Sequence, residues 1–427
     1  MHGRPRLKAS APPDPERVKA AEKKAALFGQ LAGEVLARSA AKRYDPESLA
    51  LSAKLLELHP EMYTGWNYRR TALVPVLEAG GEAAVAAVAG ELALTQRALL
   101  KNHKSYSTWH HRRWVVAKGF CSLEHELQLV NMLLDGDSRN FHGWGYRRFV
   151  VQLMGTPAER ELEYAALKIN QNFSNYSAWH SRTVLLPVLH GTPDSSAAQA
   201  AAELTATLRA AALSADPADV TGKDQPQASA QQQQHAGQQQ PQQGAAGPTP
   251  ALTAAAAASA GPHVSAAATA AVPKEALDEE YELVKQAFYT EPEDQSGWFY
   301  HRWLLGCSLA NWEQARGSEA EERECKALLA VLNREQQTCK ARLLEVLDME
   351  PEAKWALLTL TRLREVQQQV LCESGTATAA EEASGLAAQV VEGYARLKEL
   401  DPLRSGYYKD AEEGRAQVVA RPMAASA

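Results

Sequence analysis

The sequence predicts an all-α fold in which helical hairpins stack in series as a solenoid. A short segment centred on tryptophan recurs along the chain, polar helix-capping residues stand before most of its copies, and one long uncharged interval interrupts the series. Successive tryptophans lie 43, 35, 35 and 119 residues apart, and they are Trp66, Trp109, Trp144, Trp179 and Trp298. A period of about 35 residues is typical of a helix–turn–helix repeat that packs on its neighbours.

Each copy of the segment has the features of a helix start. The copies read TGWNYRR, STWHHRRW, HGWGYRRF, SAWHSRTV and SGWFYHRW, and a weaker sixth copy, AKWALLTLTR, contains Trp355. Residues of good N-cap type stand four positions before four of the tryptophans, at Ser105, Asn140, Asn175 and Asp294. Each tryptophan should be buried between hairpins, because residues four apart share one helical face.

The spacing repeated within the chain also predicts roles for the polar residues that follow each tryptophan. Arginines stand three or four positions after most of them. We expect these arginines to bond carbonyls or carboxylates between hairpins rather than to touch a substrate. His110 and His111 fit the ordinary spacer of the repeat and are expected to be structural.

An insertion explains the one long interval. Residues 225–273 contain no charged side chain and consist mostly of Ala, Gln, Pro, Gly, Ser and Thr. Such a composition cannot bury enough apolar area to offset the entropy of ordering, so this segment is expected to be disordered. Removing roughly 84 residues between His190 and Lys274 would restore the 35-residue period. The fifth repeat should then resume with a helix over residues 277–289.

The predicted organisation follows from these features. A flexible N-terminal segment (1–20) precedes the first four hairpin repeats (21–190). A largely disordered Ala/Gln-rich insertion (191–273) follows, and then come repeats five and six with a final helix (274–410) and a tail (411–427).

Composition excludes several classes of function. The net charge of −6 argues against a nucleic-acid binder, and no run approaches the eighteen apolar residues of a membrane span. The basic N-terminus is not followed by an apolar core, so it does not resemble a secretory signal. Five scattered cysteines with no CxxC pair predict reduced thiols in a cytoplasmic protein. No Gly-rich phosphate loop, HExxH or GxSxG motif occurs.

The repeated segment resembles the protein prenyltransferase α-subunit repeat, over about residues 50–370. The tetratricopeptide family shares the architecture, but its Gly–Tyr signature is not seen. Three stretches are most similar to the α subunit of Rab geranylgeranyltransferase, the type II enzyme: the opening Met1-His2-Gly3-Arg4, KSYSTWHHRRW at residues 104–114, and DQSGWFYHRWLLG at residues 294–306. The resemblance implies a right-handed α–α superhelix that is active only as a heterodimer with a β subunit.

Two other interpretations stay open. The chain could be the α subunit shared by farnesyltransferase and geranylgeranyltransferase type I, which carries the same repeats. It could also be a non-catalytic helical scaffold that binds another protein.

The type II resemblance also implies a chemistry. A geranylgeranyl group passes from geranylgeranyl diphosphate to C-terminal cysteines of Rab proteins, which a Rab escort protein presents. A zinc ion, expected on the β subunit, holds the thiol as thiolate. This chain has no convincing zinc constellation of its own, although the resemblance makes His2 a metal candidate. Preplaced cations and donors stabilise the departing diphosphate.

Matching motif to motif assigns four residues to that diphosphate. Lys104 and Tyr106 would be catalytic contacts, and Asn140 and His142 would form a substrate-binding rim from the next hairpin. Adjacent hairpins present equivalent loops on one edge of a solenoid, which should bring these pairs together. The pattern alone predicts packing for Tyr106, because that position is aromatic in the first four repeats. At the position of Lys104 the repeats hold different residue types, so the repeat pattern assigns no packing role to this lysine.

Overall fold

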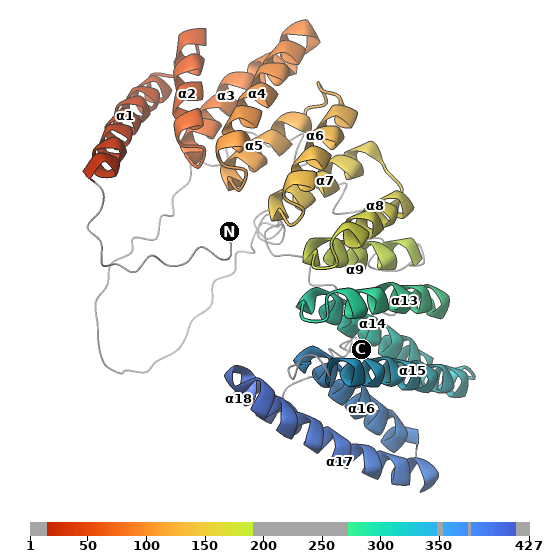
Figure 1. Cartoon of the computed structure of the whole chain (residues 1–427). Helices are drawn as coiled ribbons and strands as arrows, with labels where there is room; N and C mark the ends of the chain where they lie inside the picture. The colour runs from red at the N-terminus through yellow and green to blue at the C-terminus, as the bar shows by residue number, and fades with distance from the viewer. Residues whose placement is uncertain (1–14, 191–271, 348–352, 375–376, 416–427) are drawn as a thin grey trace, which may run out of the picture. The chain divides into compact units, whose positions relative to one another are not determined.

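The computed structural model describes residues 15–190, 272–347, 353–374 and 377–415, and every regular element in these ranges is helical (Figure 1). The described part divides into two compact units, one ending at Gly155 and the other beginning at Thr156. The predicted all-α fold of helical hairpins is confirmed within each unit.

The first unit contains three hairpins preceded by one helix. Helix α1 packs on α2, and the pairs α2/α3, α4/α5 and α6/α7 form the hairpins. The second helices of successive hairpins also pack on one another, α3 on α5 and α5 on α7. The bounds are α1 Pro15–Ala40, α2 Pro46–Leu58, α3 Tyr63–Ala79, α4 Gly81–Lys101, α5 Tyr106–Val116, α6 Leu123–Gly136 and α7 Phe141–Met154.

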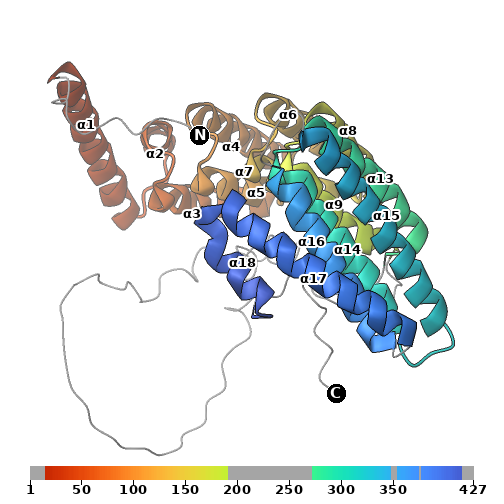
Figure 2. The ribbon, with the colours of Figure 1, turned by 60° about the horizontal axis from the view of Figure 1, so that its bottom comes forward.

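The second unit contains three more hairpins and two closing helices. The pairs α8/α9, α13/α14 and α15/α16 form the hairpins, and α17 packs along α16 (Figure 2). The bounds are α8 Ala158–Gln171, α9 Tyr176–His190, α13 Lys274–Thr290, α14 Gln295–Ala315, α15 Glu321–Leu347, α16 Lys354–Ser374, α17 Ala377–Leu400, the 3-10 turn η2 Pro402–Arg404 and α18 Ser405–Glu412.

The repeated tryptophans are buried, as predicted, and each fixes the turn of its own hairpin. The indole Nε1 of Trp66 donates to the carbonyl of Pro60 at 2.8 Å. The other four repeat the bond to the carbonyl six positions upstream, at 2.8–3.0 Å: Trp109, Trp144, Trp179 and Trp298. A buried indole N–H needs such a partner, so the tryptophan supplies both packing area and a turn-closing bond. Trp355, the weaker copy, is only half-buried.

The predicted N-caps are also confirmed. The side-chain oxygens of Ser105, Asn140, Asn175 and Asp294 each accept a hydrogen bond from a backbone N–H two or three residues on. Each cap satisfies one of the donors that a helix start leaves unpaired. The second helix of hairpins two to five therefore begins at a position fixed by its sequence.

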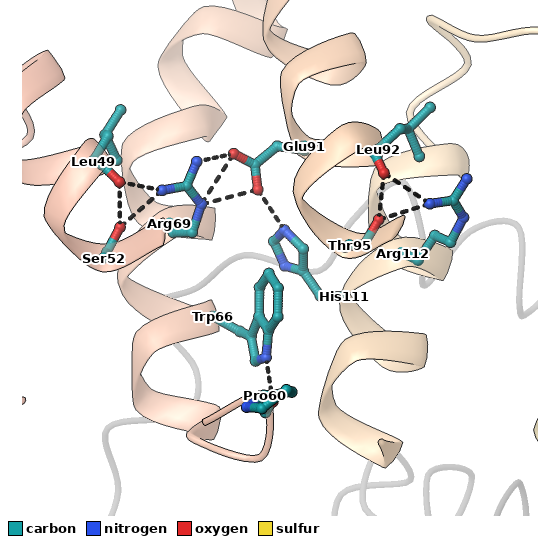
Figure 3. Close-up of polar contacts among 10 residues, drawn as sticks. All are labelled: Leu49, Ser52, Pro60, Trp66, Arg69, Glu91, Leu92, Thr95, His111 and Arg112. Carbon is teal, nitrogen blue, oxygen red and sulfur yellow. Dashed lines mark hydrogen bonds and ion pairs between the residues drawn. The ribbon is translucent and has the colours of Figure 1, made fainter. Parts of the chain in front are cut away.

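Buried glutamates join successive hairpins through a repeated arrangement, which we call the glutamate bridge. In the first one, Glu91 of α4 accepts from Arg69 of the preceding hairpin and from His111 of its own hairpin, the latter at 2.8 Å (Figure 3). Two further glutamates do the same, with tyrosine in place of histidine: Glu126 with Arg112 and Tyr146, and Glu280 with Arg182 and Tyr300. Three arginines that stand three positions after a tryptophan thus bond a carboxylate, as the sequence predicts: Arg69, Arg112 and Arg182.

The sequence separation of the two bridge residues also gives the length of the insertion. The arginine and the glutamate of a bridge are 14 residues apart for Arg112 and Glu126 but 98 apart for Arg182 and Glu280. The excess of 84 residues equals the length that restores the period. Helix α9 packs on α14, and the predicted helix over residues 277–289 is α13. The fifth hairpin therefore docks on the fourth as if the intervening chain were absent.

Some predictions of organisation are corrected or lie outside the described residues. Helix α1 begins at Pro15, so residues 15–20 of the expected flexible segment are helical. The predicted disorder of residues 191–273 falls almost entirely outside the described residues, as does most of the predicted tail.

By length and composition, one helix of the described part, α4, is apolar enough to cross a membrane, with a mean hydropathy of 1.3 in its best window. This helix nevertheless carries the buried Glu91 and packs Val88 and Leu94 into the unit. A core helix of a repeat array satisfies the same two criteria, so α4 is weak evidence for a membrane span.

The first glutamate bridge predicts a specific loss of stability in acid. Burial by itself raises the pKa of Glu91, but hydrogen bonds from His111 and Arg69 outweigh it and hold the pKa at about 2, below its ordinary 4.5. A depressed carboxyl pKa contributes stability that is complete above 4.5 and is lost as the pH falls towards 2. This contribution is about 3 kcal/mol. Glu91→Gln should therefore be less stable than the wild type at pH 6, and the difference should narrow between pH 5 and pH 3 in urea denaturation. A difference that stays constant with pH would contradict this account.

Candidate functional site

Two neighbouring helix starts of the first unit carry the four residues that the resemblance assigned. Lys104 and Tyr106 flank the start of α5, and Asn140 and His142 flank the start of α7. The rings of Tyr106 and His142 meet edge to face, with centroids 4.2 Å apart. The prediction that adjacent hairpins bring these two loops together is confirmed.

The residues at the first helix start are open to solvent. Lys104 is exposed, and its ammonium group forms no hydrogen bond or ion pair with any residue that the structure describes. The Tyr106 side chain is 68% exposed. Packing, which the pattern alone predicted for Tyr106, is therefore wrong. The equivalent aromatics are also exposed: Tyr63 by 40%, Phe141 by 66% and Tyr176 by 53%.

His142 lies half-buried in an electropositive setting. Loss of hydration lowers its pKa, and the positive charges of Arg113 and Lys104 lower it further, against the opposing charge of Glu61. The ring is therefore neutral near pH 7, so one of its nitrogens can donate a hydrogen bond and the other can accept one.

Asn140 has a structural task at the same place. Its side chain is only 2% exposed, and Oδ1 accepts from the backbone N–H of Gly143 at 3.0 Å. Its Nδ2 is buried and has no hydrogen-bond partner among the described residues. The Oδ1 of Asn140 therefore already caps α7, and only its buried Nδ2 remains for the substrate contact that the resemblance assigned.

The chemistry of this rim suits an anion. The N-termini of α5 and α7 lie side by side, and each carries partial positive charge with unpaired N–H groups. Lys104 adds a mobile point charge and Tyr106 a hydroxyl donor. His2, the metal candidate, lies outside the described residues. Within the described ranges, no group of three or more His, Cys, Asp or Glu side chains could hold a metal ion.

Sequence reasoning missed a second feature of this unit. The arginine four positions after the tryptophan was expected to bond carbonyls or carboxylates, like the one before it. In the first unit this is wrong, because Arg70, Arg113 and Arg148 bond no carboxylate or main-chain carbonyl of the described residues, and Arg70 donates only to the side chains of Tyr63 and Asn67. The repeated seven-residue segment places both arginines on one helix, but it does not reveal which of the two arginines faces the next hairpin.

Comparisons with known proteins match the repeated hairpins. A family profile described as the protein prenyltransferase alpha subunit repeat matches residues 45–74, 88–119, 123–154, 158–188 and 277–308. Each matched segment contains one of the five buried tryptophans.

Curated relatives carry a more specific name. The chain is 32% identical over 308 residues to the geranylgeranyl transferase type-2 subunit alpha of Rattus norvegicus, which covers 72% of this chain and 42% of that protein. The Homo sapiens protein of the same name matches equally. Subunit alpha 1 of Arabidopsis thaliana is 39% identical over 126 residues, 29% of this chain and 18% of that protein. The chain therefore spans less than half the length of these relatives.

A solved structure shares the fold. The match is titled Candida albicans protein geranylgeranyltransferase-I complexed with GGPP, with a TM-score of 0.53 and 17% sequence identity. It covers 91% of this chain and 90% of that chain.

The hairpins and the five matched repeats define a helical-repeat chain built from protein prenyltransferase alpha subunit repeats. Within this class it resembles the geranylgeranyl transferase type-2 α subunit.

Proposed function

We propose that this chain is the α subunit of a heterodimeric Rab geranylgeranyltransferase. The pair would transfer a geranylgeranyl group from geranylgeranyl diphosphate to C-terminal cysteines of Rab proteins. The observation that carries the proposal is the rim formed by the exposed Lys104 and Tyr106 and the half-buried His142. This rim lies on repeats whose curated relatives are named geranylgeranyl transferase type-2 subunit alpha.

The role proposed for this chain is to stabilise the departing diphosphate. Negative charge accumulates on that group as its bond to the allylic carbon breaks, so preplaced donors lower the barrier. Lys104 and Tyr106 are free to supply a charge and a hydroxyl, and His142 adds a neutral ring nitrogen beside them. Asn140 completes the proposed rim from the cap of α7.

The remaining groups belong to partners. The β subunit would supply the zinc ion that activates the cysteine thiol, together with most of the lipid pocket. A Rab escort protein would present the substrate, and the reaction would take place in the cytoplasm.

Two alternatives are tested by the identity of the partner. The chain could be the α subunit shared by farnesyltransferase and geranylgeranyltransferase type I, since its fold is similar to that of the Candida albicans geranylgeranyltransferase-I structure. It could also be a non-catalytic scaffold. Pull-down of the chain from its own cytosol should yield a stoichiometric type II β subunit. Recovery of a farnesyltransferase or type I β subunit would favour the first alternative, and recovery of neither would favour the scaffold.

Replacing Lys104 by alanine in the reconstituted pair should lower the rate of the transfer step by about 10-fold or more, because one charge that stabilises the leaving group is lost. The variant should fold as the wild type does, since the ammonium group makes no contact within the described chain, and co-purification checks that it still pairs with the β subunit. Single-turnover transfer rates measure the effect. Lys54→Ala, an exposed lysine of α2, is the matched control and should leave the rate unchanged.

A second variant separates the hydroxyl of Tyr106 from its ring. Tyr106→Phe keeps the edge-to-face contact with His142 but removes the donor, so it should slow transfer without weakening assembly. An unchanged rate in both Lys104→Ala and Tyr106→Phe would remove the diphosphate rim from the proposal.

A further inference from the structure

Two facing stripes of side chains extend from the proposed rim along α5 and α7. Tyr106 and Arg113 lie seven residues apart on α5, and His142 and Phe149 lie seven residues apart on α7, so each pair shares one helical face. The first members of the stripes meet edge to face, since Tyr106 and His142 have ring centres 4.2 Å apart. The second members also meet, because the guanidinium of Arg113 lies 5.8 Å from the ring centre of Phe149. Arg113 is therefore the residue of α5 that stands directly behind the rim.

Gly145 lets Arg113 approach α7 closely. A Cβ atom at position 145 would lie 2.9 Å from Nη2 of Arg113, which is closer than real Cβ contacts come. Glycine therefore leaves the space that this guanidinium occupies. Gly145 follows His142 by three residues, on the face of α7 that Arg113 contacts. The guanidinium thus rests against α7 about one helical turn from His142.

The charge of Arg113 is not neutralised by the described chain. Its guanidinium forms no ion pair with any described residue, and its buried Nε has no hydrogen-bond partner among them. Arg112, one position earlier, is paired with Glu126. Loss of hydration lowers the pKa of Arg113 from its ordinary 12.5, yet an arginine stays charged at neutral pH. Its positive charge therefore acts on the groups that lie beside it.

His142 is the group of the rim that this charge reaches. The ring is half-buried, and loss of hydration lowers its pKa. Among the charged groups that face it, Arg113 has the largest effect and lowers the pKa further. Glu61, before α3, acts in the opposite direction, and Lys104 and His103, before α5, act in the same direction with smaller effects. Of these three cations, Arg113 is the one that packing on α7 holds in place.

We propose that Arg113 is a positioning residue of the diphosphate rim: its fixed charge, seated against α7, keeps the ring of His142 uncharged around neutral pH. This inference rests on the proposed function, because it takes the rim as the diphosphate site. An uncharged imidazole offers the diphosphate one N–H donor, while Lys104 supplies the charge. The positive charge of the rim then does not change with pH around neutrality, so its stabilisation of the leaving group stays constant.

The first measurement is an NMR titration of His142 in the free full chain, with the ring signals assigned by means of His142→Gln. The midpoint should lie below the ordinary 6.5 in the wild type and should rise towards it in Arg113→Met, because the opposing charge is gone. Arg113→Lys keeps a positive charge at this place, so its midpoint should stay below that of Arg113→Met. Arg70→Met is the matched control, since Arg70 stands at the equivalent position one hairpin earlier, and it should leave the midpoint unchanged.

The second measurement is the single-turnover rate of geranylgeranyl transfer by the chain paired with a type II β subunit, between pH 7.5 and pH 6. The ratio of the Arg113→Met rate to the wild-type rate should rise about 3-fold or more as the pH falls, because a protonated His142 adds a charge beside the leaving group. Adding His142→Gln to Arg113→Met should make this ratio independent of pH.

The outcomes separate this inference from the proposed function. An unchanged His142 midpoint in Arg113→Met would overturn the inference, and a lower melting temperature of that variant would then assign Arg113 a purely structural role. A shifted midpoint with a rate ratio that stays constant with pH would also overturn it, since the charge of His142 would then play no part in transfer. Absence of transfer by the wild-type pair would instead sink the proposed function, a result that involves none of the variants.

Discussion

Arg182→Met is expected to destabilise the second unit by about 3–5 kcal/mol, because it leaves Glu280 as a buried carboxylate without its counter-charge. Arg182 donates to Glu280 from Nε at 2.8 Å and again from Nη2, and it also bonds the carbonyl of Leu162. These side chains are 10% and 6% exposed, so solvent screens the pair little. Urea denaturation followed by circular dichroism measures the loss.

Two controls make this expectation specific. Arg97→Met breaks the exposed pair of Arg97 with Glu57 and should change the unfolding free energy by less than about 1 kcal/mol. Adding Glu280→Gln to Arg182→Met removes the stranded charge and should recover part of the loss. If Arg182→Met proved as mild as Arg97→Met, the glutamate bridge would not be what holds the fifth hairpin to the fourth.

Trp66→Ala is expected to destabilise the first unit by about 3–5 kcal/mol, by opening a cavity in its core. The side chain is fully buried, packs with Leu56 and Leu94, and stacks on His111 with ring centres 4.6 Å apart. The substitution also removes the indole bond that closes the turn at Pro60. Thermal and urea unfolding of the full chain measure the effect.

The matched control lies in the degenerate sixth repeat. Trp355 is half-buried, and its Nε1 donates to the carbonyl of Glu293, 62 residues upstream, at 3.2 Å. Trp355→Ala should therefore destabilise the chain clearly less than Trp66→Ala. Equal losses at the two positions would mean that the indole-closed turn adds nothing to the stability of a hairpin.

The parts of the fold that were predictable follow from local chemistry. An N-cap must precede a helix, a tryptophan of fixed spacing must be buried, and a segment with no charge and little apolar bulk interrupts a repeat. These rules located the caps at Ser105 and Asp294 and the 84-residue excess between Arg182 and Glu280. The glutamate bridge itself was only half predicted, because its carboxylate lies on a helix with no fixed motif.

The site was less predictable, because it depends on which face of each helix the neighbours cover. His110 and His111 are adjacent in sequence, yet His111 is fully buried on Glu91 while His110 is exposed. The aromatic position of Tyr106 was predicted to pack and is exposed, and the second arginine of each pair in the first unit was predicted to bond between hairpins but bonds no carboxylate of the described residues. Asn140 was predicted both as the N-cap of α7 and as a substrate contact, and the structure shows its side chain in the cap.

The most direct measurement is geranylgeranyl transfer by the full chain mixed with a type II β subunit, with a Rab protein, its escort protein and geranylgeranyl diphosphate. The account predicts transfer to the Rab cysteines by the mixture and none by either chain alone. A stable complex of the two chains that transfers nothing, or transfer by the β subunit alone at the same rate, would contradict it.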